Sequence, residues 1–460
     1  MNMAASLAAL DARFGEVLGT RWLATAAATA RYGQSEGHHG GRPPDRVALP
    51  ASIAEVQTLV RAAGDASVPI VPYGAGTSLE GNAEACQGGL CIDLSRMNRI
   101  SEIRPEDLLC VVEPGVTREQ LNIELRDTGL FFPIDPGANA TLGGMIATRA
   151  SGTNAVRYGT MRENVLALEV VLSDGALVRT GTRARKSSAG YDLTHLFLGS
   201  EGTLGIVVGA TLKLYGTPEV VMSGTWPFAT LGGAVDTVIA TIQMGVPVAR
   251  MELLDAAAIR ACNAFAGMTL PEQPTLFIEL HGSAAAVAEQ HDLVAAIGND
   301  LGGGVLEMSR DGDRRNQLWR ARHNALPAAR ALVPGAVTWV TDICVPISEL
   351  AEAIARAQRL IAAERLIAPI LGHVGDGNFH VFFVLEPGDV AGFERAARVN
   401  RAMIEHALSV GGTCTGEHGI GSGKREALLA EHGAPGVALM RRLKDALDPQ
   451  ALFNPGKIFL

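Results

Sequence analysis

The sequence is poor in cysteine, has no run of basic residues and lacks a long apolar stretch. Its six cysteines include no C-x-x-C pair, which argues against a disulfide framework, a zinc ribbon and an iron–sulfur site. We expect Cys86 and Cys91 to be small core residues. A net charge of −9 without a basic stripe excludes the usual nucleic-acid binder and fits a solvated acidic surface.

The longest stretch without charge, Val220–Val235, contains Pro227 and falls short of the roughly 20 apolar residues of a membrane helix. Charged residues interrupt the apolar N-terminus at Asp11, Arg13 and Glu16, so no signal peptide is predicted. We expect a cytoplasmic protein, either free or peripheral to the inner membrane. With 47% hydrophobic and 19% charged residues in 460, it should be globular with two or three domains.

The pattern of predicted elements changes along the chain. Residues 1–217 mix strands, short helices and glycine-rich loops, which is typical of the α+β class. Ser52 and Glu55 form a capping box for a helix expected to end near Gly64, and Asp174-Gly175 predicts a hairpin turn. Residues 218–410 carry longer, alanine-rich helices and indicate a second domain. Residues 411–460 are expected to pack back on the first domain.

Three glycine-rich stretches in the first part suggest a ligand. The loop PYGAGTSLEG (Pro72–Gly81) follows a strand and could hold a phosphate, although a plain surface turn is the alternative. A dinucleotide fingerprint would need glycine where Leu79 stands. The stretch Pro133–Thr160 has little charge, and its backbone groups need partners, which a large planar cofactor with a diphosphate would supply. GSEGTLGIV (Gly199–Val207) opens a further strand.

Three histidines fall in two other glycine-rich patches, LGHVGDGNFH (Leu371–His380) and GEHGIG (Gly416–Gly421). A type I′ turn at Asp376-Gly377 would place His373 opposite His380, with Cβ atoms about 5 Å apart. Two imidazoles that close suit a divalent metal, and Glu417 could add an oxygen. The alternative is a pair of half-buried hairpin histidines. Gly416 and Gly419 would permit the turn that brings Glu417 and His418 to one site.

In their order and spacing, the three first-domain stretches resemble those of the vanillyl-alcohol oxidase / p-cresol methylhydroxylase flavoproteins. Residues 42–460 are most similar to the D-2-hydroxyacid dehydrogenase branch, which includes FAD-linked D-lactate dehydrogenase and the glycolate oxidase flavoprotein subunit. The resemblance implies an α+β fold. Its parts would be a PCMH-type FAD-binding domain of two α/β subdomains, with its core at about 42–217, and a ferredoxin-like substrate or cap domain.

The resemblance also implies which residues surround FAD. The pyrophosphate would be held by Pro72, Gly74, Ala75, Gly76, Thr77 and Ser78. The flavin and its ribityl chain would be lined by Pro136, Gly137, Thr141, Gly144, Ser151, Gly152, Asn154 and Tyr158. The adenine end would lie near Glu201, Gly205 and Ile206. In the C-terminal DPQALFNPGKIF, Asn454 is expected to approach the flavin or to form a plain turn. The Pro72–Ser78 loop has no histidine, so FAD is expected to be non-covalent, with His38 and His39 at the surface.

The same resemblance assigns the catalytic groups. His373, His380 and Glu417 match the ligands of a divalent metal, zinc or manganese, and His418 matches the base. In LWRARHNA (Leu318–Ala325), Arg322 rather than Arg320 matches the arginine that binds the substrate carboxylate. The metal would lower the pKa of the substrate hydroxyl, His418 would take its proton, and hydride would pass to flavin N5. The implied reaction is oxidation of a D-2-hydroxy acid, D-lactate favoured, to the 2-oxo acid.

Departures from the family pattern bear on the substrate. In relatives that act on 2-hydroxyglutarate, a Thr and a Lys contact the second carboxylate, and Leu326 and Val340 stand at those positions. Phe382 replaces an Asn, so a monocarboxylate is favoured. Glycolate, another 2-hydroxymonocarboxylate and 2-hydroxyglutarate are the alternative substrates.

Other functions and partners are left open by the sequence. A metal-free sister flavoprotein acting on an alcohol or ether-lipid precursor, a non-catalytic electron-transfer subunit and a zinc hydrolase are the rival functions. The electron acceptor could be a quinone, a cytochrome, an electron-transfer flavoprotein or oxygen, and a homodimer is an open expectation.

Overall fold

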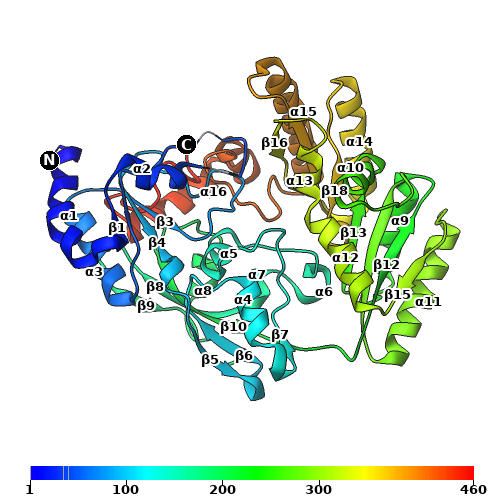
Figure 1. Ribbon diagram of the computed structural model, residues 1–460, viewed down its shortest axis with the longest axis horizontal. Coiled ribbons are helices and arrows are strands. Elements are labelled where there is room, and N and C mark those ends of the chain that lie inside the picture. Colours follow the sequence, from blue (N-terminus) through cyan, green and yellow to red (C-terminus); the bar gives the residue numbers. More distant parts are fainter. Residues whose placement is uncertain (1, 35, 40) are drawn as a thin grey trace. The chain divides into compact units, whose positions relative to one another are not determined.

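The computed structural model describes residues 2–34, 36–39 and 41–460 and divides into two compact units (Figure 1). Unit 1 comprises Met1–Ser151, Thr160–Gly216 and Glu417–Leu460. Unit 2 comprises Gly152–Gly159 and Thr217–Gly416. The short segment Gly152–Gly159 therefore belongs to unit 2 although unit 1 flanks it in sequence, and this interleaving is absent from the predicted boundaries.

Unit 1 is built on two separate sheets (Figure 1). The first is mixed, because β2 and β3 run parallel to β4 while β1 runs antiparallel to β2. Its order is β1 (Trp22–Leu23), β2 (Arg46–Ala48), β4 (Leu90–Asp93) and β3 (Ile70–Tyr73). The second is antiparallel, in the order β5 (Ile100–Arg104), β6 (Leu109–Val112), β10 (Ile206–Lys213), β8 (Val165–Val171) and β9 (Leu177–Arg179). Two short strands, β7 (Leu130–Phe131) and β11 (Tyr215–Gly216), pair with each other.

Each sheet of unit 1 has its own hydrophobic core. The long helices α1 (Met3–Leu18) and α3 (Ile53–Asp65) bury Leu10 and Val56 against the first sheet, where Phe453 of the C-terminal segment joins them. Helices α4 (Arg118–Glu124) and α5 (Leu142–Thr148) bury Leu121 and Met145 against the second sheet. The mixture of helices and sheets confirms the predicted α+β class, and the first core also includes Val171, Ile206 and Val208 of the second sheet. The last helix of the unit is α16 (Arg425–Leu447), kinked at Gly433.

Two elements of unit 1, a helix and a hairpin, lie close to the positions predicted from local sequence signals. Helix α3 begins after Ser52, whose Oγ accepts the Glu55 N–H at 3.3 Å, but the Glu55 carboxylate accepts the N–H of Ala51 at 2.7 Å instead of completing the capping box. The predicted hairpin forms between β8 and β9. Its loop covers residues 173–175, because Leu172 N–H donates to Ala176 O and Gly175 takes a φ of 79°. The loop is thus longer than a two-residue turn.

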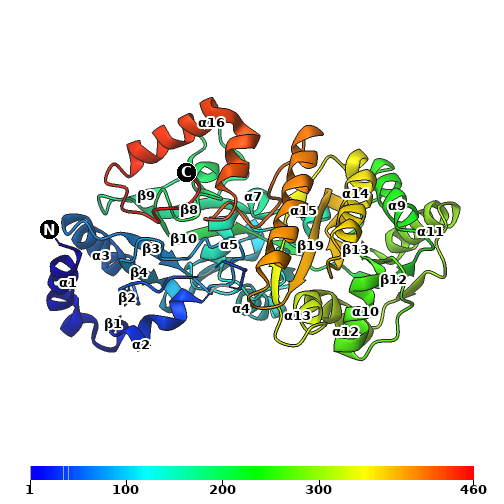
Figure 2. The ribbon, with the colours of Figure 1, turned by 90° about the horizontal axis from the view of Figure 1, so that it is seen from above.

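Unit 2 contains one large antiparallel sheet. Its order is β15 (Glu307–Ser309), β12 (Val220–Pro227), β14 (Thr275–Gly282), β13 (Arg250–Leu254), β18 (Ile370–Gly372), β19 (Asn378–Leu385) and β16 (Val337–Val340), with β17 (Ile343–Cys344) also paired to β19. One face packs against α9 (Leu231–Gln243), α11 (Ala284–Asp300), α14 (Leu350–Ala363) and α15 (Val390–Ser409). Near the other face lie α10 (Ala256–Ala266), α12 (Gly312–His323) and α13 (Ala325–Arg330) (Figure 2).

The two faces of this sheet differ in chemistry because side chains alternate along a strand. The helix-covered core contains Met251, Ile278 and Phe379, with their i+2 neighbours. The intervening residues point to the opposite face. Several of them are buried and polar, namely Glu252, Glu279, His281, Asn378 and His380, and Arg250 is half-buried. Burying so many polar groups costs free energy unless they are paired. We therefore treat this polar face of the sheet as a candidate functional site.

Two composition-based predictions can be compared with the described residues. All six cysteines are free; Cys91 is buried as expected, but Cys86 is exposed, so its prediction as a core residue is wrong. Among the described residues, no helix combines the length and apolar character needed to cross a membrane.

Candidate functional site

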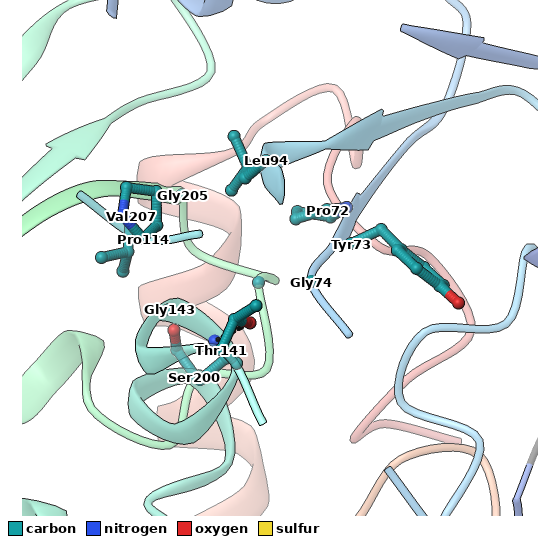
Figure 3. A pocket seen from close by; sticks show the side chains of 13 residues that line it. Pro72, Tyr73, Gly74, Leu94, Pro114, Thr141, Gly143, Ser200, Gly205 and Val207 are labelled. Atoms are coloured by element: carbon teal, nitrogen blue, oxygen red, sulfur yellow. Dashed lines mark hydrogen bonds between the residues drawn. The ribbon is translucent and has the colours of Figure 1, made fainter. Parts of the chain in front are cut away.

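A cavity opens in unit 1 between the end of β3 and the start of α5 (Figure 3). The space not filled by atoms amounts to about 460 Å³, a figure that includes space open to solvent. Its lining contains no charged side chain and consists of Pro72, Tyr73, Gly74, Leu94, Pro114, Thr141, Gly143, Gly144, Ala147, Ser200, Gly202, Gly205 and Val207. Of the predicted cofactor residues, Pro72, Gly74, Thr141, Gly144 and Gly205 line this cavity.

Close backbone approach explains why glycines surround the cavity. A Cβ on Gly74 would lie 2.2 Å from Oγ1 of Thr141, and one on Gly202 would lie 2.9 Å from Cγ of Pro72. The wall combines backbone groups and the hydroxyls of Tyr73, Thr141 and Ser200 with the apolar side chains of Pro72, Leu94, Pro114 and Val207. Backbone N–H groups and hydroxyls can hydrogen-bond a diphosphate without an opposing acidic side chain, so this lining has the chemistry expected for the phosphate-bearing cofactor that the sequence predicts. Ala75, Gly76, Thr77, Ser78, Pro136, Gly137 and Ser151 lie outside its lining.

Two of the predicted cofactor residues, Glu201 and Asn454, make hydrogen bonds within unit 1. The buried Glu201 carboxylate accepts the N–H groups of Ile420 at 2.7 Å and Gly421 at 2.8 Å and the Asn82 amide at 2.6 Å. Burial raises the pKa of Glu201, although these donors act in the opposite direction. Asn454 donates to the carbonyls of Asn82 at 2.8 Å and Glu201 at 2.7 Å.

These bonds fix the segment Glu417–Leu460 within unit 1. Ile206 lies in the core of the first sheet. No sequence pattern had singled out Asn82, which links Glu201 to the carbonyl of His418 at 3.3 Å.

Three further predicted flavin residues, Gly152, Asn154 and Tyr158, belong to unit 2. Asn154 Oδ1 accepts the Nε–H of Arg250 at 3.0 Å, and the Tyr158 hydroxyl lies 2.8 Å from Nδ1 of His281. The chain of contacts continues from His281 Nε2 to Glu279 at 2.9 Å and from Glu279 to Trp319 Nε1 at 2.6 Å. Sequence reasoning missed Arg250, His281 and Glu279; the unusual polar residues at alternate positions of β13 and β14 were the available signal.

The predicted register of the histidine hairpin is wrong. His380 pairs with Leu371, and His373 lies beyond the end of β18. The cause is a longer turn, in which Val374–Asp376 forms a 3₁₀ turn and only Gly377 has a positive φ, 78°. The two rings are nevertheless neighbours, with centroids 5.5 Å apart and planes at 87°, and a ligand nitrogen of each lies within 4.8 Å of the other.

The partners of the two histidines define their tautomers. His373 Nδ1 lies 2.8 Å from Oε1 of Glu252, and His380 Nδ1 lies 2.9 Å from the carbonyl oxygen of Thr341. Both partners can only accept, so each Nδ1 carries the hydrogen and donates. In the neutral rings Nε2 is then the basic nitrogen, which is the form that binds a metal.

A buried arginine completes the polar face of unit 2. Arg322 donates from Nε at 3.0 Å and from Nη2 at 2.6 Å to Oε2 of Glu252, whereas Arg320 is exposed. The sequence left both arginines as candidates, and the structure places Arg322 beside His373 through their common partner Glu252. On the same face, Val340 pairs with Phe382, whose ring centroid lies 6.5 Å from that of His380.

The end of unit 2 is held by a buried aspartate. Asp342 accepts the Thr415 hydroxyl at 2.7 Å and the Asn378 amide at 2.9 Å. A Cβ on Gly416 would lie 2.3 Å from Nδ2 of Asn378, so close approach explains that glycine. Glu417, the first residue of the returning part of unit 1, follows directly. Gly419 has the positive φ, 79°, that the sequence led us to expect.

His418 and its surroundings lie in unit 1. Its Nδ1 is 3.8 Å from Oε1 of Glu80, and the same oxygen is 2.9 Å from Lys424 Nζ. Burial opposes ionisation of Glu80, but Lys424, His39 and His418 together lower its pKa well below the usual range.

The pair His38 and His39 had been expected at the surface. Both are only partly exposed, and burial, with the neighbouring His39, lowers the pKa of His38 to about 3. His39 is directed toward Glu80, with its Nε2 3.5 Å from Oε2 of that carboxylate.

Comparisons with known proteins agree with this arrangement. Residues 217–458 match the family "FAD linked oxidases, C-terminal domain", and residues 44–181 match "FAD binding domain". The chain is 49% identical to "Probable D-lactate dehydrogenase, mitochondrial" of Danio rerio, over 93% of this chain and 87% of the relative. It is 44% identical to a mitochondrial D-lactate dehydrogenase (cytochrome) of Arabidopsis thaliana, over 92% and 75%. The crystal structure of p-cresol methylhydroxylase matches with a TM-score of 0.81 at 17% identity, covering 99% of this chain and 97% of that one.

Proposed function

Because this chain belongs to the FAD-linked oxidases, we propose that it oxidises a D-2-hydroxy acid, with D-lactate favoured, to the 2-oxo acid. The proposal rests on one observation above all. Two histidines with neighbouring rings both donate from Nδ1 to buried acceptors, an arrangement that prepares Nε2 of each ring for a metal ion. A plain structural pair of histidines would not need both rings fixed in the same tautomer.

Unit 1 is the proposed cofactor unit. Non-covalent FAD would be held along the uncharged cavity by Pro72, Gly74, Thr141, Gly144 and Gly205, with the rest of the Pro72–Ser78 loop on its pyrophosphate. When bound, FAD accepts the hydride that leaves the substrate α-carbon. Pro136, Gly137, Ser151, Gly152, Asn154 and Tyr158 stay predicted flavin neighbours. Glu201 and Ile206 stay predicted neighbours of the adenine end, and Asn454 stays a predicted neighbour of the flavin.

Unit 2 supplies His373, His380 and Arg322 of the proposed site, whereas Glu417 and His418 belong to unit 1. His373 and His380 would bind zinc or manganese with Glu417 as the carboxylate ligand, a donor set that leaves positions open for substrate. When bound, the ion lowers the pKa of the substrate hydroxyl. Arg322 would bind the substrate carboxylate through a charge-assisted hydrogen bond, and His418 would remove the hydroxyl proton.

The polar face also suggests which acids fit. Val340 and Phe382 form an apolar cross-strand pair on the face that carries His380. A second carboxylate placed there would lose its hydration without gaining a partner. We therefore infer that small monocarboxylates such as D-lactate or glycolate are preferred over 2-hydroxyglutarate.

The direct test is anaerobic mixing of the purified holoenzyme with D-lactate, L-lactate, glycolate and D-2-hydroxyglutarate in turn. Bleaching of the flavin band near roughly 450 nm by D-lactate, and its loss after removal of the metal with a chelator, is the expected result. No bleaching by any 2-hydroxy acid would overturn the proposal. Bleaching that survives complete metal removal would favour the metal-free sister flavoprotein. A colourless protein with hydrolytic activity would favour the zinc hydrolase.

The second half of the cycle needs an electron acceptor. We propose that a cytochrome, a quinone or an electron-transfer flavoprotein reoxidises the reduced holoenzyme, and comparing the rates of reoxidation by each of them and by oxygen identifies it. A cytoplasmic location and a homodimer stay predictions from the sequence.

A further inference from the structure

The buried carboxylate Glu252 lies between two groups to which the proposed function gives different tasks. It is the third residue of β13, and strand alternation turns it to the polar face of the sheet in unit 2. Its side chain is 1% exposed. One oxygen accepts from His373 Nδ1 at 2.8 Å, and the other accepts from Arg322 at 2.6 and 3.0 Å.

Both carboxylate oxygens are therefore used, and each serves one partner. A buried carboxylate of this kind is stable only while its charge is compensated, and Arg322 supplies that charge. Arg322 is itself 7% exposed and would be equally costly without Glu252. Removing the Glu252 carboxylate would therefore leave the Arg322 charge buried without compensation and would remove the acceptor that orients the imidazole of His373.

We propose that Glu252 is a positioning residue that sets the metal site and the substrate arginine at the same time. By accepting from Nδ1 of His373, it holds the tautomer and ring orientation in which Nε2 can bind the metal. By accepting from the Nε and Nη2 groups of Arg322, it occupies one edge of the guanidinium. It leaves Nη1 on the other edge to the substrate carboxylate. This inference rests on the proposed function of the histidines and the arginine.

The substitution Glu252→Gln separates this role from packing because it keeps the shape and removes one acceptor. If the amide NH₂ group faces His373, it must donate to Nδ1, and the ring hydrogen moves to Nε2, where it blocks a metal. If the amide is turned over, its NH₂ group faces the Arg322 donors and no hydrogen bond forms. Either orientation damages one of the two partners.

The control is Glu279→Gln on the adjacent strand β14. Glu279 lies on the same face, is 3% exposed, and also holds a histidine and one further donor, His281 Nε2 at 2.9 Å and Trp319 Nε1 at 2.6 Å. It thus matches Glu252 in burial and strand geometry, and it too pairs with an arginine, since Arg250 Nε lies 3.4 Å from its Oε1. Glu279 makes its hydrogen bonds with His281 and Trp319, whereas Glu252 makes its own with His373 and Arg322.

The measurement is the dissociation constant of Zn²⁺ for the FAD-loaded enzyme, by competition with a chromogenic chelator, together with the KM for D-lactate. We expect Glu252→Gln to weaken Zn²⁺ binding about 10- to 100-fold and to raise KM. Glu279→Gln should bind Zn²⁺ within about twofold of wild type, since its partners are other residues. Glu252→Asp, which keeps the charge on a shorter side chain, should bind Zn²⁺ with intermediate affinity, and it provides the test if the Gln variant does not fold.

The outcomes separate this inference from the function on which it rests. If wild type binds Zn²⁺ and both Glu252 variants bind it equally well, the positioning role is overturned while the metal site stands. If Glu279→Gln weakens Zn²⁺ binding as much as Glu252→Gln, the effect is a general loss of the polar face and the specific role is again overturned. If wild type binds neither Zn²⁺ nor Mn²⁺, the proposed metal site and the role of Glu252 fail together.

Discussion

The Nζ atom of Lys424 lies 2.9 Å from Oε1 of Glu80, and both side chains are almost completely buried. Glu80 is in direct reach of His418, so this ion pair fixes the surroundings of the proposed base. Replacing Glu80 with Gln would leave the Lys424 charge buried without compensation, and we expect a loss of about 3–5 kcal/mol in the free energy of unfolding at pH 7. Urea unfolding monitored by circular dichroism measures this.

The pH dependence of that loss has a definite sign. Because the folded-state pKa of Glu80 is lowered from 4.5, its stabilising contribution is complete above that pH and fades as pH falls below it. The difference between wild type and Glu80→Gln should therefore shrink under acid conditions. Glu84→Gln is the matched control: burial raises the pKa of Glu84, so neutralising it should not destabilise at pH 7. Equal losses for the two variants would contradict the assignment.

Close packing at the cofactor cavity gives a second prediction. A Cβ at Gly74 would lie 2.2 Å from Oγ1 of Thr141, whereas one at Gly216 meets nothing within 4 Å. We expect Gly74→Ala to lower FAD affinity at least about fivefold, since overpacking costs roughly 1–3 kcal/mol, and Gly216→Ala to bind normally. Fluorescence titration of the FAD-free protein with FAD gives both constants. Normal binding by Gly74→Ala would show that the loop does not form the cofactor wall.

Two arginines on one helix provide a test of carboxylate binding. Arg322 is buried beside Glu252, and Arg320, two residues earlier on α12, is exposed. Lysine keeps the charge but cannot donate to Glu252 from two nitrogens and to the substrate from a third. We expect Arg322→Lys to raise the KM for D-lactate at least about tenfold and Arg320→Lys to change it by less than about twofold. Steady-state kinetics decides, and an unchanged KM for Arg322→Lys would remove it from the site.

Asp255 gives a prediction about stability alone. It caps α10 by accepting the Ala258 N–H at 2.8 Å, and burial raises its pKa from 3.8 to about 6. A raised folded-state pKa means that its contribution is present below pH 3.8 and is lost as pH rises through 6. Asn caps equally well without the charge, so Asp255→Asn should be more stable than wild type at pH 7, by up to roughly 3 kcal/mol. The gain should vanish near pH 4. Thermal melts at both pH values test this, and a destabilised variant at pH 7 would refute it.

Local signals in the sequence predicted the fold well where one residue type decides the geometry. Ser52 starts a helix, Gly175 closes a hairpin and Gly419 takes a positive φ, because these features depend on the residue itself. The turn at Asp376-Gly377 was misplaced because its length is set by how Val374–Asp376 packs, and Val374 belongs to the large core of unit 2. Register errors of this kind arise when tertiary packing overrides a turn signal.

The candidate site was predicted in its charged and histidine residues but not in their supports. His373, His380 and Arg322 stood out by type and by resemblance. Glu252, Glu279 and Asp342 did not, since a carboxylate in sequence gives no sign of burial until the alternation of its strand is known. Asn82 was missed for a related reason: its partners, Glu201 and His418, are 119 and 336 residues away in the sequence.

The placement of Gly152–Gly159 in unit 2 limits how this protein can be taken apart or recombined. The polypeptide passes between the units at 151/152, 159/160, 216/217 and 416/417. A chimera that exchanged only 217–416 with a relative would import Arg250 and His281 of the donor and keep the recipient's Asn154 and Tyr158. In such a chimera, hydrogen-bond partners in one polar network would come from two different parent proteins. Gly152–Gly159 must therefore be exchanged together with Thr217–Gly416 whenever unit 2 is replaced by that of another member of this family.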